Sequence, residues 1–308
     1  MFVLLTGGTG GAKLVDGLCR EVDPADITIV CNTADDFILH GLHVSPDLDT
    51  IMYTLAGLSD PVKGWGIQND TFTVVQQLEK LGGEGWFKLG DKDLATHLMR
   101  TRLLREGFML SAVTDRLRKT LDIRAAILPM SNDKIDTWID TEQGEISFQE
   151  YFVKQRWQPA VKNIRYAGVE KSRPAPGLLD AMGKASGVII CPSNPVTSTG
   201  PILAVPGIRE TLKDLQTPVV AVSPIIGEAA ISGPAHKLMP ARGMEPSAFG
   251  VAFAYADFID AFVIDDQDKK TAGKIAGLGI EVASSSIVMN CLADKRRLAR
   301  EVLALFEK

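Results

Sequence analysis

Cysteine is scarce in this sequence, and long apolar runs are missing. The 308 residues include four cysteines, none of them in a CxxC spacing: Cys19, Cys31, Cys191 and Cys291. This pattern excludes a disulfide framework or a common zinc site and fits a reducing compartment. Apolar runs such as 187–190 are far shorter than the roughly 18 residues of a membrane span, and no basic segment precedes the apolar residues 2–5. We therefore predict a cytoplasmic protein without a signal peptide or membrane contact.

An excess of basic residues is missing as well. The chain has 33 Lys and Arg against 38 Asp and Glu, a net charge of −5. Non-specific nucleic-acid binding needs a basic face, so we predict no nucleic-acid partner. An anionic small ligand stays possible because backbone amides and one or two lysines are enough to hold a phosphate.

The two ends of the chain alternate short apolar strands with helices. The pattern begins with a strand at 2–5, a loop at 6–11, a helix at 12–20 and a strand at 27–31. It resumes late in the chain with strands at 187–191, 218–222, 261–264 and 280–282 and with helices at 207–215 and 293–306. Such alternation is typical of a parallel sheet covered on both faces. We predict one α/β domain, 1–308, with a doubly wound, mainly parallel Rossmann-like sheet.

The middle of the chain has a different pattern, and we predict that 66–165 is an inserted, mostly helical region with a hairpin. Its apolar spacing favours helices at 71–81, 93–106 and 111–120, then a strand at 125–128. Two further apolar runs flank the turn 142–144 and predict the hairpin 137–148.

A glycine-rich loop, TGGTGGAK at 6–13, follows the first strand. Ligands of open parallel sheets bind beyond the carboxyl ends of the strands, where glycine amides and a helix N-terminus favour a pyrophosphate. The loop is not a standard fingerprint, because Lys13 stands where a dinucleotide loop has glycine, and the Gly-Lys-Ser/Thr of a Walker loop is absent. A tight turn without a ligand is the alternative.

Four aspartates follow the second strand: Asp35, Asp36, Asp47 and Asp49. We expect Asp47 and Asp49, two residues apart after Pro46, to point to the same side of an extended backbone. Carboxylates from two loops suit Mg²⁺, which prefers one or two of them plus substrate phosphates. The alternative is helix capping, with a helix beginning at Asp49 or Thr50.

Further polar segments follow later strands or precede helices. The segment 89–97 holds Asp91, Asp93 and His97, which either cap and pack a helix or contact a ligand. The loops 191–200, 223–227 and 232–237 are rich in Ser, Pro and Gly, and we expect them to line one crevice together with the first loop. Because no GxSxG elbow and no paired cysteine is present, we do not expect covalent catalysis.

Several strings occur in a consistent order along nearly the whole chain: TGGTGGAK at 6–13, NTADD at 32–36, SPDLDT at 45–50, KGWGIQNDTF at 63–72, LGDKDLATH at 89–97, FQEYF at 148–152, PSNPVTSTGPILAVPG at 192–207 and SPIIG at 223–227. Together they resemble the 2-phospho-L-lactate transferase family of deazaflavin coenzyme synthesis, including its phosphoenolpyruvyl-using members. The resemblance is weakest after about residue 240.

The resemblance implies transfer of a phospholactyl or phosphoenolpyruvyl group from a diphosphoguanosine donor to 7,8-didemethyl-8-hydroxy-5-deazariboflavin. GMP is released, coenzyme F-420 is the end product, and the enzyme is a homodimer. Carried over by motif, Asp35 and Asp49 are the catalytic and Mg²⁺-binding residues. The deazaflavin contacts are Asp49, Lys88, Asp91 and His97. The nucleotide and phosphate contacts are Gly8, Thr9, Gly10, Gly11, Lys13, Ser193, Asn194, Ser198 and Gly227.

Two other functions share the general architecture. One is a regulatory protein that binds nucleotide sugars, from which the motifs between 45 and 97 distinguish this chain. The other is a nicotinamide-dependent oxidoreductase, for which Asp35 is a suitable acid after the second strand but Lys13 removes the required glycine.

Overall fold

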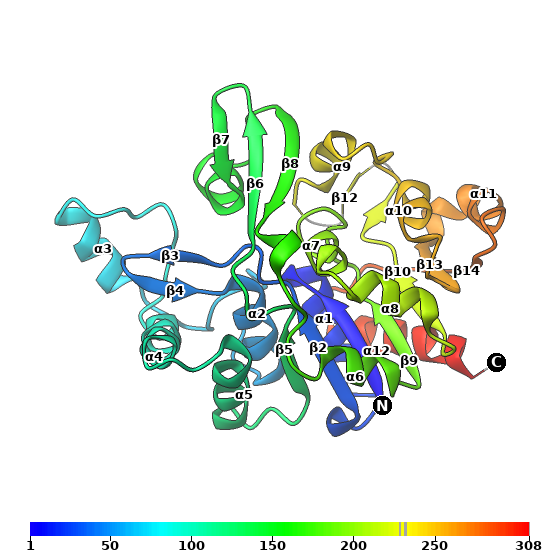
Figure 1. Cartoon of the computed structure of the whole chain (residues 1–308), viewed down its shortest axis with the longest axis horizontal. Coiled ribbons are helices and arrows are strands. Elements are labelled where there is room, and N and C mark those ends of the chain that lie inside the picture. The colour runs from blue at the N-terminus through cyan, green and yellow to red at the C-terminus, as the bar shows by residue number, and fades with distance from the viewer. Residues whose placement is uncertain (228, 231–232, 308) are drawn as a thin grey trace.

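A sheet of seven parallel strands forms the centre of the computed structural model, which describes residues 1–227, 229–230 and 233–307. The strands are β1 (Phe2–Thr6), β2 (Ile27–Cys31), β5 (Ala126–Pro129), β9 (Gly187–Ile190), β10 (Val219–Val222), β13 (Ala261–Asp265) and β14 (Glu281–Ser285). Their order is β14-β13-β10-β9-β1-β2-β5 (Figure 1). The chain winds outward from β1 in one direction and from β9 in the other, so the predicted doubly wound Rossmann-like sheet is confirmed.

Helices cover both faces of this sheet, because strand residues alternate between the two. Leu4 of β1 packs in one core cluster, and Val3 and Leu5 pack in the other. The Leu4 cluster includes side chains of α1 (Gly8–Leu18), α2 (Pro46–Leu55), α5 (Leu110–Thr120) and α12 (Leu292–Leu303). The opposite cluster includes side chains of α6 (Leu178–Gly183), α7 (Thr199–Ala204), α8 (Ile208–Asp214), α9 (Ala235–Ala241), α10 (Ala248–Tyr255) and α11 (Ala272–Ala276).

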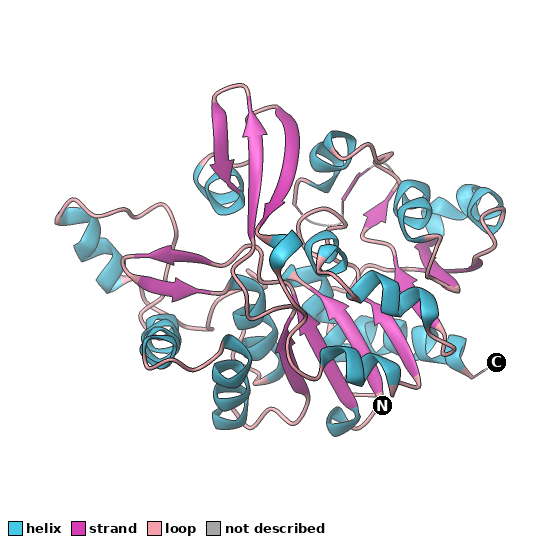
Figure 2. Cartoon of the chain, in the orientation of Figure 1, coloured by secondary structure: helices cyan, strands magenta, loops and turns pink. Residues whose placement is uncertain are grey.

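Smaller elements project from the sheet. A hairpin of β3 (Phe37–Leu39) and β4 (Leu42–Val44) lies with α3 (Thr73–Lys80) and α4 (Asp93–Arg105) on the left of Figure 2. Above the sheet stands an antiparallel sheet of β6 (Asp136–Thr141), β7 (Gly144–Ser147) and β8 (Val161–Ala167). Further short elements are β11 (Ile225–Ile226), β12 (Ala229–Ala230), a π-helical turn at Glu150–Lys154, and 3-10 turns at Pro24–Asp26, Val169–Lys171, Asp266–Thr271 and Ala304–Phe306.

The three predicted helices of the middle region and its hairpin are confirmed. The hairpin β3–β4 and the third strand β8 were not predicted. The strand β5 falls inside the range predicted as an insertion, yet it pairs with β2 and forms one edge of the central sheet. The division into one domain with an insertion at 66–165 stays a prediction.

The expectation of an extended backbone at Asp47 and Asp49 is wrong. Both lie in the first turn of α2, which begins at Pro46 with Ser45 as its N-terminal cap residue. Proline is favoured at the first helical position because its missing N–H is not needed there. Residues two apart on a helix point in nearly opposite directions. The two carboxylates therefore face different surroundings.

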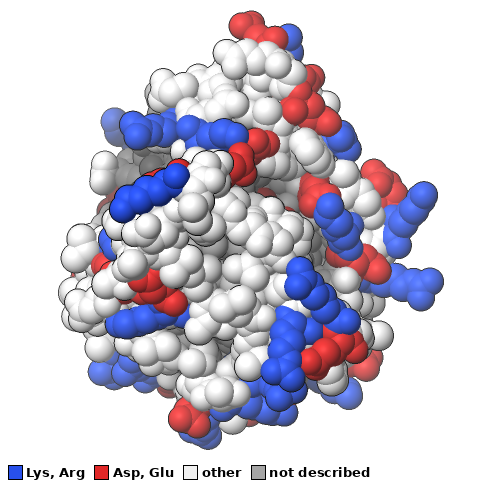
Figure 3. Space-filling view, turned by 90° about the vertical axis from the view of Figure 1, so that its left-hand side faces the viewer, with Lys and Arg blue, Asp and Glu red and all other residues white. Residues whose placement is uncertain are grey.

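Charged side chains of both signs lie interspersed over the side of the molecule shown in Figure 3. Several exposed ion pairs join residues three or four apart in the sequence. One example is Arg102 Nε with Glu106 Oε1, 2.7 Å apart at the C-terminal end of α4. Exposed pairs of this kind contribute about 1 kcal/mol or less. In the described part of the chain, no helix is both long enough and apolar enough to cross a membrane.

Candidate active site

The loops after β1 and β9 meet where the winding of the sheet changes direction. The Ser193 hydroxyl donates to the Gly7 carbonyl at 2.8 Å and accepts from the Gly7 amide at 3.1 Å. Gly11 packs against the same serine: a Cβ there would lie 1.9 Å from Thr6 Oγ1 and 2.5 Å from Ser193 Oγ. The absence of a side chain at residue 11 therefore lets the two loops form one wall.

A cavity of about 510 Å³ opens beside this wall. Its floor is the glycine loop with the N-terminus of α1, and its sides come from the carboxylates after β2, the start of α2 and the loop after β9. Residues that line it include Gly7, Gly8, Thr9, Gly10, Asp35, Asp47, Asp49, Tyr53, Asp93, His97, Pro192, Ser193, Asn194, Thr197 and Ser198. The crevice predicted from strand-end loops is present, at the place where such sheets bind ligands.

Asn32 brings two of the cavity's carboxylates together. Its amide nitrogen donates to Asp35 Oδ2 at 3.0 Å and to Asp47 Oδ2 at 2.9 Å. Burial raises the pKa of Asp47 to about 6, and it raises the pKa of Asp35 well above the usual range, with the charge of Asp47 as a further cause. The other oxygen of Asp47 accepts from the Gly8 amide at 2.7 Å, which ties the carboxylate to the glycine loop.

A second cluster surrounds Asp49. Its carboxylate is paired through both oxygens with the guanidinium of the buried Arg100, whose Nη1 lies 3.0 Å from Asp49 Oδ2. His97, one turn earlier on α4, has Nδ1 3.7 Å from Asp49 and Nε2 3.2 Å from Asp93. The hydroxyl of Tyr53 donates to the same oxygen of Asp93 at 2.6 Å. Asp49 is thus held in one orientation by α4.

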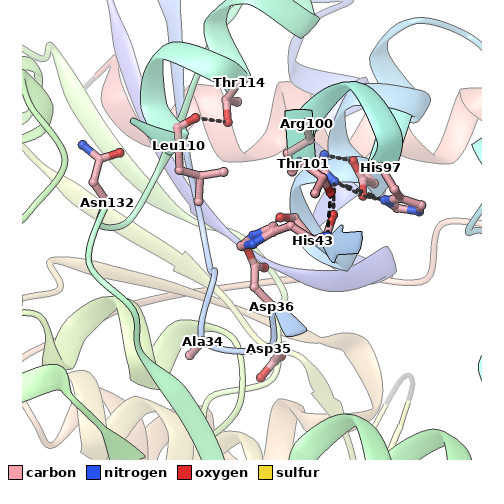
Figure 4. Close-up of polar contacts among 12 residues, drawn as sticks. Ala34, Asp35, Asp36, His43, His97, Arg100, Thr101, Leu110, Thr114 and Asn132 are labelled. Atoms are coloured by element: carbon pink, nitrogen blue, oxygen red, sulfur yellow. Dashed lines mark hydrogen bonds and ion pairs between the residues drawn. The ribbon is translucent and has the colours of Figure 1, made fainter. Parts of the chain in front are cut away.

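Asp36 connects the loop after β2 to the hairpin β3–β4. It accepts from the Ser45 hydroxyl at 2.6 Å and contacts Nε2 of His43 at 3.0 Å, and Thr101 on α4 accepts from the His43 amide. Burial raises the pKa of Asp36, and the contact with His43 opposes this shift. Figure 4 shows His43 with Asp36 on one side and Arg100, Thr101 and His97 on the other.

The cluster around Asp35 and Asp47 is better suited to bind a cation than the cluster around Asp49. Asp35 Oδ1 is buried and has no hydrogen-bond partner among the described residues, and a cation would relieve the repulsion between Asp35 and Asp47. Ligand atoms of Asp49, Asp93 and His97 also lie within 4.8 Å of one another. There, however, Arg100 already neutralises Asp49. The donor set around Asp35 suits a hard cation such as Mg²⁺.

Aromatic side chains, which we call the aromatic wall, also line the cavity. Phe148 and Phe152 stack with centroids 5.5 Å apart and planes 13° apart, and Trp65 and Phe87 face the same space. Flat rings of this kind favour a planar aromatic ligand. The cavity therefore combines the glycine loop, a group of aspartates and an aromatic wall.

Most of the residues predicted to contact the nucleotide line the cavity or pack against it, and their contact with a nucleotide stays a prediction. Gly8, Thr9, Gly10, Ser193, Asn194 and Ser198 line it, and Gly11 packs beneath. Lys13 lies further along α1 and does not line the cavity that the described residues form. The amide of Gly227 donates to both carboxylate oxygens of Asp268 at 3.0 Å. Ser232, in the segment 232–237, lies outside the described residues, while Pro234 and Ala235 line the cavity.

Of the residues predicted to contact the deazaflavin, three line the cavity and one does not. Asp49, Lys88 and His97 line the cavity, and Lys88 Nζ is paired with Glu79 at 3.1 Å. Asp91 instead accepts from the Thr71 hydroxyl and from the first amides of α3, and these bonds lower its pKa to about 2. Its contact with a deazaflavin stays a prediction.

Several site residues were not among the predicted ones. Asn32 stands inside the string 32–36, but its role depends on how β2 and α2 meet. Asp47 is one of the four predicted aspartates, and only its link to Asp35 through Asn32 is absent from the prediction. Arg100 follows three residues after His97 and carries no motif of its own. Lys63, in the string 63–72, lines the cavity with Trp65; its basic side chain in a noted string was the available signal.

Known proteins match this chain over its whole length. The family described as 2-phospho-L-lactate transferase CofD matches residues 2–291. A 2-phospho-L-lactate transferase of Methanosarcina mazei is 42% identical over 304 residues, covering 99% of this chain and 100% of the relative. A phosphoenolpyruvate transferase of Streptomyces griseus is 42% identical over 312 residues, covering 99% and 98%.

A crystal structure of a UPF0052 family member from Bacillus halodurans superposes with a TM-score of 0.65 at 18% identity, covering 98% of each chain. At this identity the likeness shows the shared fold alone.

Fold, cavity and relatives together define an enzyme of the transferase class. More particularly, the chain belongs to the 2-phospho-L-lactate transferase family, as its strings of residues predict. These relatives give no support to a nucleotide-sugar-binding regulator or to a nicotinamide-dependent oxidoreductase.

Proposed function

We propose that this enzyme transfers a phospholactyl or phosphoenolpyruvyl group from a diphosphoguanosine donor to 7,8-didemethyl-8-hydroxy-5-deazariboflavin, with release of GMP, in coenzyme F-420 biosynthesis. The observation that carries the proposal is the composition of the cavity, which is lined by the glycine loop, by a group of aspartates and by several aromatic side chains. The relatives named as 2-phospho-L-lactate and phosphoenolpyruvate transferases support the transferred group. A cytoplasmic, homodimeric enzyme is part of this proposal.

The reaction needs positioning more than a protein nucleophile. The acceptor hydroxyl attacks the distal phosphorus, its proton passes to solvent, and the bond from that phosphorus to the bridging oxygen breaks, so that GMP leaves with this oxygen. The amides at the start of α1 bind the diphosphate, and the aromatic wall holds the deazaflavin ring. Asp49, fixed by Arg100, orients the acceptor hydroxyl. Placing both substrates in line contributes most of the rate enhancement that such a site gives.

Mg²⁺ is the cofactor in this proposal, and it supplies charge neutralisation for the diphosphate when bound. Asp35 would hold it, and the family resemblance implies Asp49 as the second carboxylate. Asp47 is the further candidate because it shares the Asn32 amide with Asp35. The variants Asp47→Asn and Asp49→Asn separate the two: the variant of the true ligand raises the Mg²⁺ concentration needed for half-maximal activity.

Fluorescence quenching of the deazaflavin, with and without GDP and Mg²⁺, tests the acceptor. We expect saturable binding in the micromolar range that weakens in Lys88→Ala, since Lys88 lines the cavity. Lys80→Ala is the control, because Lys80 is an exposed lysine at the end of α3. Failure of the wild type to bind deazaflavin under all these conditions would contradict the proposed function.

Turnover tests the catalytic role of Asp49. Asp49→Asn keeps the size of the side chain but removes its charge, and we expect a loss of about a thousandfold in rate, roughly 4 kcal/mol of transition-state stabilisation. Near-normal turnover with unchanged deazaflavin affinity would show that Asp49 has no such role.

A further inference from the structure

The cavity carries more negative than positive charge. Asp35, Asp47, Asp49 and Asp93 line it, whereas the lysines that line it, among the described residues, are Lys63 and Lys88. Lys88 is already paired with Glu79. A diphosphate that enters this cavity needs cationic partners, and the protein's own contribution then depends strongly on Lys63.

Lys63 lies on a short loop, residues 59–67, which we call the strap. Ser59 and Ile67 form a bridge at its base, and the Gly64 amide donates to the Asp60 carbonyl at 2.8 Å. The carboxylate of Asp60 accepts from the amide of Lys63 at 3.1 Å. Gly64 has a φ of +74°, in the left-handed region that favours glycine. The strap therefore has a defined turn that fixes the backbone of Lys63.

The tip of the strap lies against the glycine loop. A Cβ built on Gly64 would be 3.6 Å from Cγ2 of Thr9, so the backbone of the strap lies next to the Thr9 side chain. Trp65, the next residue, is 43% exposed and lines the cavity. The strap thus forms the wall next to the loop that is proposed to hold the diphosphate.

The ammonium group of Lys63 is held in place by its neighbours, but not all of its N–H donors are taken. Its Nζ lies 3.4 Å from Asp60 Oδ2, and the centroids of the Phe72 and Trp65 rings are 5.3 Å and 5.6 Å away. Cation–π contacts hold a lysine without taking its N–H donors. With three N–H groups and one long ion pair, Lys63 keeps donors for an anion.

We propose that Lys63 binds the distal phosphate of the diphosphoguanosine donor, the phosphate that carries the transferred acid. This inference rests on the proposed function, since it takes the donor to be a guanosine diphosphate derivative. Lys63 is a binding residue in this assignment, and it adds a lysine on the strap to the backbone amides of the neighbouring glycine loop.

Calorimetric titration with GDP and with GMP, in the presence of Mg²⁺, tests the assignment because only GDP has the distal phosphate. We expect Lys63→Ala to weaken GDP binding about tenfold, the loss of one exposed charged hydrogen bond, and to leave GMP binding within about twofold. Lys63→Arg, which keeps the charge, should retain most of the GDP affinity. Lys269→Ala is the matched control, because Lys269 forms a similar exposed pair with Asp266 at 3.0 Å but does not line the cavity.

Two results would overturn the assignment while leaving the proposed function in place. One is GDP binding by Lys63→Ala as tight as in the wild type. The other is an equal loss of GDP and GMP affinity, which would mean that Lys63 supports the strap rather than the distal phosphate. A wild-type enzyme that binds neither nucleotide would overturn the proposed function and, with it, this inference.

Discussion

Arg100 and Asp49 form a buried, two-pronged ion pair across α4 and α2, although 51 residues separate them in the sequence. The Arg100 side chain is 1% exposed and that of Asp49 7%. Burial by itself would lower the pKa of Arg100, but the charge of Asp49 raises it. The pair therefore links the first turn of α2, where the cavity begins, to a helix outside the central sheet.

Removing one partner of this pair should destabilise the protein. Arg100→Met leaves the charge of Asp49 buried and unpaired, and we expect a loss of about 3–5 kcal/mol in the free energy of unfolding, measured by urea denaturation. Arg102→Ala is the control: Arg102 is 71% exposed and paired on the surface of the same helix, so its change should stay within about 0.5 kcal/mol. If Arg100→Met behaves like Arg102→Ala, the buried pair does not have the role assigned to it.

Asn32→Asp should separate Asp35 from Asp47. The substitution keeps the shape of the side chain but replaces the shared N–H donor by a third carboxylate. Like charges at this distance repel in a buried site, so we expect a loss of at least about 2 kcal/mol without Mg²⁺ and partial recovery on adding Mg²⁺. The exposed Asn163 on β8 supplies the control, Asn163→Asp. Thermal unfolding that is unaffected by Asn32→Asp would argue against the cluster.

Gly11→Ala tests how closely the two strand-end loops must approach. A Cβ at Gly11 would overlap Thr6 Oγ1 and Ser193 Oγ, so we expect weaker GDP binding and a lower melting temperature. Gly183→Ala, at the end of α6, meets no atom within 4 Å and should be neutral or stabilise by about 0.5–1 kcal/mol, since alanine favours helix. Equal GDP affinity in the wild type and Gly11→Ala would show that the loops tolerate separation.

The raised pKa of Asp47 gives a pH dependence with a defined sign. The folded protein binds this proton more tightly than the unfolded chain, whose Asp pKa is near 3.8. The contribution of Asp47 to the free energy of unfolding is therefore most favourable below about pH 4, and it is lost as the pH rises through about 6. Asp47→Asn does not ionise, so the stability of this variant relative to the wild type should increase by roughly 2–3 kcal/mol between pH 4 and pH 7.

Urea denaturation of both proteins without Mg²⁺ measures this difference. A stability difference that is constant from pH 4 to pH 7 would contradict the assignment. Mg²⁺, if it binds beside Asp47, should reduce the difference at pH 7.

The order of elements and the crevice could be predicted from the sequence because they depend on local patterns. Apolar strands followed by Gly-, Ser- and Pro-rich loops determine where ligands bind in such a sheet. It could not be predicted in the same way that Asp47 and Asp49 contact different partners. A proline favours extended backbone in the residue before it, whereas here Pro46 itself begins α2, and the helix directs Asp47 and Asp49 to different partners.

Residues whose role depends on distant partners were also missed. Arg100 looks like any basic residue on an amphipathic helix until α4 packs against β4 and α2. Asn32 is a strand-end polar residue, and only its contacts with Asp35, Asp47 and the Thr197 carbonyl show its function. These are tertiary contacts, and periodicity within one segment carries no information about them.

The pairing of β1 with β9, in register from Phe2 with Gly187, has a consequence for biosynthesis of the enzyme. During synthesis, β1 has one of its two neighbours at hand early, in β2, but the other, β9, emerges only after the whole middle region. Pairings so distant in sequence form late in folding. A growing chain that ends before Ser193 has only one wall of the crevice, so the GDP of the proposed function would stabilise the finished enzyme against unfolding but not its unfinished precursors.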